Sequence, residues 1–84
     1  MHIYFVTFRS VTFAQRGEKL LNQQGFRVSL MRTPRWMEEQ GCGYALKLWS
    51  SDITFVVKLL REGKIQLRKV YAQWEDGHME EIKI

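Results

Sequence analysis

The chain has 84 residues, a length typical of one domain, and its 45% hydrophobic content supplies one core and argues against disorder. Its formal charge of +4 is modest for a nucleic-acid binder, and its single cysteine excludes an internal disulfide. No apolar run approaches the roughly 18 residues of a membrane span and the N-terminus does not resemble a signal peptide, so we expect residues 1–84 to form one cytoplasmic domain without a membrane partner.

The first elements predicted are a strand and a helix. Residues 2–8 are dense in aromatic and β-branched side chains without clean alternation, which indicates a strand covered on at least one face. Ser10 is placed to cap a helix that Gly25 ends. Gly17 in the middle of that helix costs about 1 kcal/mol against Ala, so we expect it to permit close helix–sheet packing.

Two alternating segments follow, separated by an irregular one. Residues 26–31 alternate as a half-buried strand does, and residues 32–43 lose all periodicity and contain the only proline. Residues 44–49 alternate again, with Tyr44, Leu46 and Leu48 predicted inward and Ala45, Lys47 and Trp49 outward.

The last part of the chain predicts a second helix and a fourth strand. Ser50 or Ser51 is expected to cap the helix, and Gly63 to end it. Its apolar stripe has i, i+3, i+4 and i+7 spacing and consists of Ile53, Val56, Val57 and Leu60. Residues 69–74 alternate as a strand, and the tail 75–84 either adds a short fifth strand or frays.

The predicted order is therefore strand, helix, strand, strand, helix, strand. This order is typical of an α+β, ferredoxin-like βαββαβ two-layer sandwich with an antiparallel sheet of strand order 4-1-3-2. In that fold the end of the first strand, the start of the first helix, the end of the second strand and the start of the third meet at one rim.

Cys42 lies directly before the third strand, between Gly41 and Gly43, so this rim is the candidate site. A thiolate is the nucleophilic form of cysteine, and its pKa falls below about 8.5 near helix N-termini and cations. The residues expected to stabilise an anion at Cys42 are Arg9, Ser10, Arg32, Arg35, Gly41 and Gly43.

The opposite interpretation, a buried structural cysteine, stays open, because cysteine often acts as a small hydrophobe. His2 and His78 lie in the first strand and the tail, which does not favour a Cys–His dyad. One thiol and two scattered histidines are also a poor ligand set, so no metal is expected.

Several of these segments resemble a small bacterial family, the putative selenium/sulfur carrier protein-like domains. The similar segments are "YFVTFRSVTFA", the helix with Glu18-Lys19-Leu20-Leu21, "FRVSLMRTPR" and Cys42-Gly43 opening the third strand, within about residues 3 to 62. The resemblance implies a carrier that holds selenium or sulfur on Cys42 and needs no other cofactor. It also implies a partner protein for the transfer, so the chain is not expected to be an enzyme on its own. Glu38 and Glu39 depart from this picture, because acidic groups near the thiol oppose its ionisation.

A non-catalytic protein- or RNA-binding module is the alternative. The outward positions Arg27, Met31, Lys47, Trp49, Tyr71 and Gln73 make a partly basic, aromatic sheet surface. The third strand lacks the glycine and paired aromatics of the RNP1 pattern, so nucleic acid is not the expected partner. A homo-oligomer formed through this sheet face is the other expectation.

Overall fold

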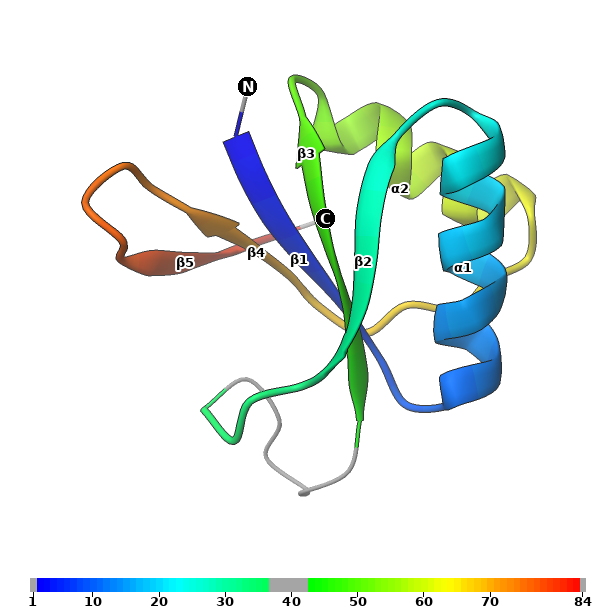
Figure 1. The fold of residues 1–84 in the computed structure, drawn as a ribbon, viewed down its shortest axis with the longest axis horizontal. Coiled ribbons are helices and arrows are strands. Elements are labelled where there is room, and N and C mark those ends of the chain that lie inside the picture. The colour runs from blue at the N-terminus through cyan, green and yellow to red at the C-terminus, as the bar shows by residue number, and fades with distance from the viewer. Residues whose placement is uncertain (1, 37–42, 84) are drawn as a thin grey trace.

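The computed structural model describes residues 2–36 and 43–83, and it has two helices on one side of a five-stranded sheet (Figure 1). The elements in chain order are β1 (His2–Phe8), α1 (Val11–Gln23), β2 (Arg27–Arg32), β3 (Tyr44–Ser50), α2 (Ile53–Glu62), β4 (Val70–Gln73) and β5 (Met79–Ile82).

The sheet order is β2-β3-β1-β4-β5, and every neighbouring pair is antiparallel. The predicted α+β class is confirmed, and the order from β4 to β2 is the predicted 4-1-3-2. The predicted order is nevertheless incomplete, because β5 adds a further strand beside β4. A tight turn makes this pairing: Gly77 has a φ of 92°, and the Trp74 N–H donates to the His78 carbonyl at 2.9 Å.

The main core lies between the helices and the sheet face that they cover. The third strand contributes Leu46 and Leu48, both fully buried, and Tyr44 packs against them at the edge, as the alternation predicted. From α2 the stripe Val56, Val57 and Leu60 is buried. Figure 1 shows the β4–β5 hairpin extending away from both helices.

The predicted N-terminal cap is confirmed for α1 but not for α2. Ser10 caps α1, its hydroxyl accepting from the Phe13 N–H at 3.1 Å. The prediction of Ser50 or Ser51 as the cap of α2 is wrong, because Asp52 caps that helix and accepts from the Phe55 N–H at 3.2 Å. Ser50 instead accepts from the Asp52 N–H at 2.9 Å, which turns the chain just before the cap.

Gly17 confirms the prediction of close helix–sheet packing. A Cβ at this position would lie 3.2 Å from Leu46 Cδ1 and 3.3 Å from both Leu60 Cδ2 and Phe8 Cζ. The glycine therefore lets α1 approach β1, β3 and α2 at once.

None of the helices within residues 2–36 and 43–83 covers the other sheet face, and we call it the helix-free face. Phe5 and Tyr71 form a second buried cluster there, with Ile3, Met31 and Met79 packed against it. Ala45 and Tyr71, both expected to point outward, are 0% and 8% exposed. The prediction of an open surface is wrong at these two positions. Tyr71 packs with Phe5 in this cluster, and Ala45 lies between its strand partners Thr7 of β1 and Met31 of β2.

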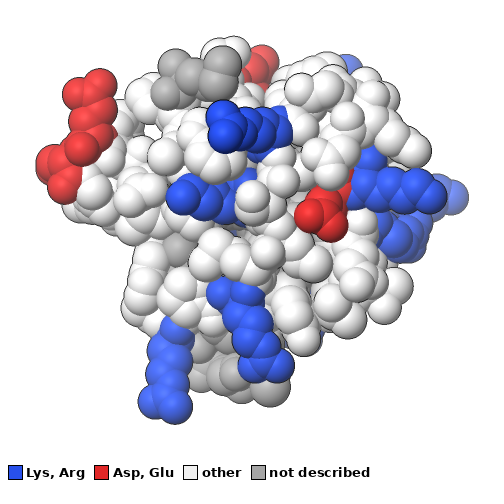
Figure 2. Space-filling view, viewed as in Figure 1, with Lys and Arg blue, Asp and Glu red and all other residues white. Residues whose placement is uncertain are grey.

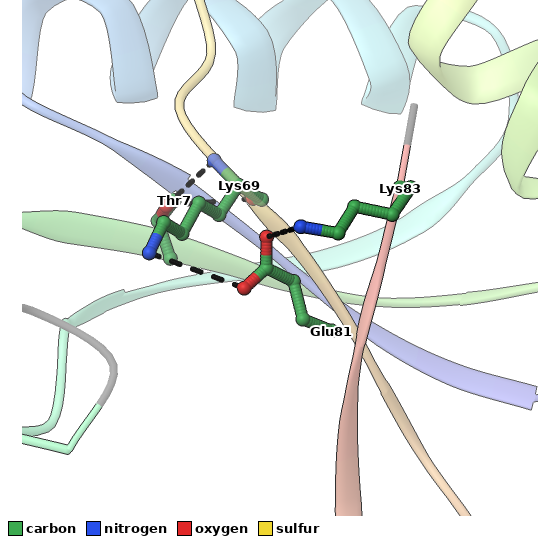
Figure 3. Close-up of polar contacts among 4 residues, drawn as sticks. All are labelled: Thr7, Lys69, Glu81 and Lys83. Carbon is green, nitrogen blue, oxygen red and sulfur yellow. Dashed lines mark hydrogen bonds and ion pairs between the residues drawn. The ribbon is translucent and has the colours of Figure 1, made fainter.

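The chain enters β4 through a junction with β1 (Figure 3). Thr7 exchanges backbone hydrogen bonds with two successive residues: its N–H donates to the Lys69 carbonyl at 2.9 Å, and its carbonyl accepts from the Arg68 N–H at 2.8 Å. Two residues opposite one form a β-bulge, which increases the local twist of the sheet. Farther along, Lys69 Nζ lies 3.9 Å from Glu81 Oε1, and Lys83 Nζ lies 3.9 Å from Glu81 Oε2.

Candidate functional site

The ends of three strands meet at the edge of the sheet where the site was predicted. The register places Phe8 opposite Tyr44 and Tyr44 opposite Arg32. The Thr33 N–H donates to the Gly43 carbonyl at 3.1 Å, which extends the β2–β3 pairing beyond both strands. This hydrogen bond holds Gly43 directly before the start of β3, and Gly43 is buried.

Two of the predicted site residues, Gly41 and Cys42, lie outside the described residues. Cys42 is bonded in the chain to Gly43, whose position the strand pairing fixes. The described part of the site consists of Gly43 and of the residues expected to stabilise an anion at the thiol, Arg9, Ser10, Arg32 and Arg35.

Arg9 and Ser10 lie together at the start of α1. Both line an open hollow of about 510 Å³, whose other lining residues are Phe13, Gln66, Leu67, Arg68 and Lys69. The Ser10 hydroxyl is already engaged as the helix cap. The residues after α2 were not predicted to be here, because only the pairing of β4 with β1 brings them to this edge.

Arg32 and Arg35 have different surroundings from Arg9. The Arg32 guanidinium lies 5.7 Å from the centre of the Tyr44 ring, a cation–π contact at the edge of the sheet. Arg35 is exposed, and its neighbours Pro34 and Trp36 line a hollow on the helix-free face. No single described pocket contains all the arginines that the sequence grouped together.

The hollow on the helix-free face has a volume of about 570 Å³ and a mainly apolar lining. Trp36 remains 58% exposed, and its ring lies 5.6 Å from that of Tyr71 in an edge-to-face arrangement. Pro34 and Trp36, near the end of the described residues 2–36, thus lie on this face. Sequence reasoning missed this contact: the lack of alternation in residues 2–8 indicated a strand covered on at least one face, but not that Trp36 lies over the helix-free face.

A shifted pKa is found at Asp76, in the turn between β4 and β5. The pKa of Asp76 is lowered below 3.8, first because the His78 N–H donates to its carboxylate at 3.0 Å, and then because of the His78 ring. Within residues 2–36 and 43–83, no group of three or more His, Cys, Asp or Glu side chains could hold a metal ion. None of the described helices is long and apolar enough to cross a membrane.

Comparison with protein families matches residues 3–72 to the family described as putative Se/S carrier protein-like. The match extends beyond the expected limit near residue 62 and includes most of β4. Neither the curated proteins nor the solved structures contain a match. Because the family match spans most of its length, the chain belongs to the putative Se/S carrier protein-like family.

Proposed function

We propose that this chain carries a sulfur or selenium atom on Cys42 and passes it between partner proteins. The observation that carries the proposal is the family match over residues 3–72, within which Cys42 is the sole cysteine. The strand pairing of Gly43 supports it, because this pairing fixes the backbone of the residue that directly follows Cys42.

The chemistry needs no outside oxidant. The Cys42 thiolate attacks the outer atom of a persulfide or selenosulfide on the donor, the new bond forms to that atom, and the donor leaves as a thiolate. In delivery, a nucleophile of the acceptor attacks the carried atom, and Cys42 leaves as the thiolate. Each step exchanges one bond for another, so the domain acts as a carrier and is not an enzyme on its own.

Stabilisation of the anion is the role we propose for Arg9, Ser10, Arg32 and Arg35, together with the backbone of the two flanking glycines. Arg9 and the start of α1 share one hollow, and their positive charge supports the stabilisation of an anion at this edge. We further propose that the fold is a ferredoxin-like sandwich extended by β5, and that the protein works in a reducing cytoplasm, where its thiol stays free.

Intact-mass measurement of the protein purified without reductant tests carriage. We expect a species heavier by one sulfur or one selenium atom that dithiothreitol removes and that Cys42→Ser lacks. A second measurement follows the rate of Cys42 alkylation by iodoacetamide against pH. An apparent pKa above about 8.5, or a thiol that does not react in the folded protein, would contradict the proposal.

A non-catalytic interaction module is the second candidate, and the helix-free face supports it. Its apolar hollow lies beside exposed Trp36, and exposed tryptophans are frequent anchors of protein interfaces. Binding of RNA by base stacking fits less well: Phe5 and Tyr71 are buried, and Arg27 and Lys47 lie 5.1 and 5.3 Å from the Trp49 ring.

Light scattering during size-exclusion chromatography tests a homo-oligomer through this face. A dimer that Trp36→Ala dissociates supports the module, and Phe55→Ala, which removes an exposed aromatic of α2, is the matched control. A monomer at all concentrations argues against self-association through the sheet.

A further inference from the structure

Charge is distributed unevenly over this protein. Four of its nine acidic residues, Glu75, Asp76, Glu80 and Glu81, lie within and beside the β4–β5 hairpin. In Figure 2 the end of the molecule over this hairpin is acidic, and basic side chains predominate over the rest of that view. The cations are therefore concentrated on the body of the sandwich.

One part of this basic region is concave. The connection from α2 to β4 spans residues 63–69, and residues 64–69 of it line two adjoining open hollows of about 560 and 510 Å³. The two hollows share three lining residues, Gln66, Leu67 and Arg68. A partner that enters one of them therefore borders on the other.

Cations from three parts of the sequence surround this connection. Arg61 and Lys64 line the first hollow, and Arg9 lines the second. Arg16 extends from α1 toward the same connection, with Nη2 3.5 Å from the Gly63 carbonyl oxygen. We call the surface formed by Arg9, Arg16, Arg61, Lys64 and the connection 63–69 the basic face.

The lining of the two hollows contains no acidic side chain, although Lys69 of the second hollow contacts Glu81 from outside it. All residues that line the two hollows belong to the described part of the chain, and none of them is Asp or Glu. The four cations of the basic face are exposed. Clustered like charges repel one another, and a ligand of opposite charge relieves that repulsion as it binds.

We propose that the basic face docks an acidic surface of a partner protein. Each hollow has room for several side chains, and carboxylates match arginine and lysine donors. Single-stranded nucleic acid fits less well, because such sites stack bases on exposed aromatic rings. The aromatic residue at these hollows, Phe13, is half-buried, and the Arg16 guanidinium already lies 5.9 Å from its ring centre. This docking does not depend on chemistry at Cys42.

The test measures binding of a fluorescein-labelled poly-glutamate peptide by fluorescence anisotropy. Arg61→Glu with Lys64→Glu should weaken binding roughly tenfold, and binding should also weaken as salt rises. The matched control, Arg27→Glu with Lys19→Glu, changes the same residue types and the same net charge outside the hollows and should change the Kd less than about twofold. Equal losses in both pairs would show attraction by net charge alone and would overturn the proposal.

A replacement pair of variants and an RNA titration complete the binding experiment. If the charge-reversed pair does not fold, as judged by circular dichroism, Arg61→Gln with Lys64→Asn replaces it, because asparagine tolerates the positive φ of 59° at Lys64. The same variants are titrated with labelled single-stranded RNA of mixed sequence. RNA that binds more tightly than the peptide and is lost with Arg61 and Lys64 would make nucleic acid the partner and overturn the acidic-protein proposal.

Discussion

The side chain of Thr7 and the backbone of Lys69 hydrogen-bond in both directions. The Thr7 hydroxyl accepts from the Lys69 N–H at 3.1 Å and donates to the Lys69 carbonyl at 3.4 Å, and Thr7 is only 2% exposed (Figure 3). This contact fixes the point where the connection 63–69 becomes part of the sheet. It therefore couples β1 to Lys69, which lines the second of the two basic hollows.

Replacing Thr7 with valine should destabilise the fold at this junction. The substitution keeps the shape but removes both side-chain hydrogen bonds to Lys69, so we expect a loss of about 1 kcal/mol in the free energy of unfolding. Urea denaturation followed by circular dichroism measures it. Thr7→Ser, which keeps the hydroxyl, is the control, and equal stability of the valine variant and the native protein would contradict the role of these bonds.

Gly17→Ala should also destabilise the protein, although alanine favours helices by about 1 kcal/mol. The added methyl would lie 3.2–3.3 Å from atoms of Leu46, Leu60 and Phe8. Because these residues belong to three different elements, a shift of α1 that relieves the clash with one of them tightens the contact with another. Overpacking costs about 1–3 kcal/mol, and we expect a net loss of about 1 kcal/mol by thermal or urea unfolding. Gln15→Ala on the exposed side of α1 is the control. An increase in stability for Gly17→Ala would show that α1 can move away from the sheet at little energetic cost.

The α2 cap distinguishes between neighbouring residues that the sequence could not separate. Asp52→Ala should cost about 1 kcal/mol because the Phe55 N–H loses its acceptor, and Asp52→Asn should cost much less. Ser51→Ala should leave the unfolding midpoint unchanged, since Ser51 is exposed and is not the cap. A larger loss for Ser51→Ala than for Asp52→Ala would restore the original prediction.

Asp76 gives the hairpin a defined response to acid. Its pKa is lowered below 3.8, mainly by the His78 N–H, so its contribution to stability is present above about pH 3.8 and is lost as the pH falls through the lowered value. In His78→Ala the backbone donor remains, so the pKa of Asp76 should rise only part of the way to 3.8. Carboxyl chemical shifts followed against pH by NMR measure the pKa of Asp76 in the native protein and in the variant. An unchanged pKa in the variant would show that the His78 ring does not lower the pKa of Asp76.

The elements themselves followed from local patterns in the sequence. The alternation in residues 26–31 and 44–49, the stripe of Val56, Val57 and Leu60, and the Ser10 cap all involve residues a few positions apart. Such patterns need only the helical or strand repeat to be read. Gly17 was also predictable, because a glycine in mid-helix is costly unless packing requires it.

What surrounds the candidate site depended on contacts between distant residues. The burial of Tyr71 beside Phe5 and its contact with Trp36, like the convergence of Arg9, Arg61 and Lys64 around residues 63–69, follow from strand pairing and helix placement. The sequence by itself determined the helices, the first four strands and the thiol directly before Gly43. Only the tertiary structure decided which side chains share a hollow. Pairing between residues far apart in the sequence sets those neighbours, and local periodicity does not reveal which distant segments pair.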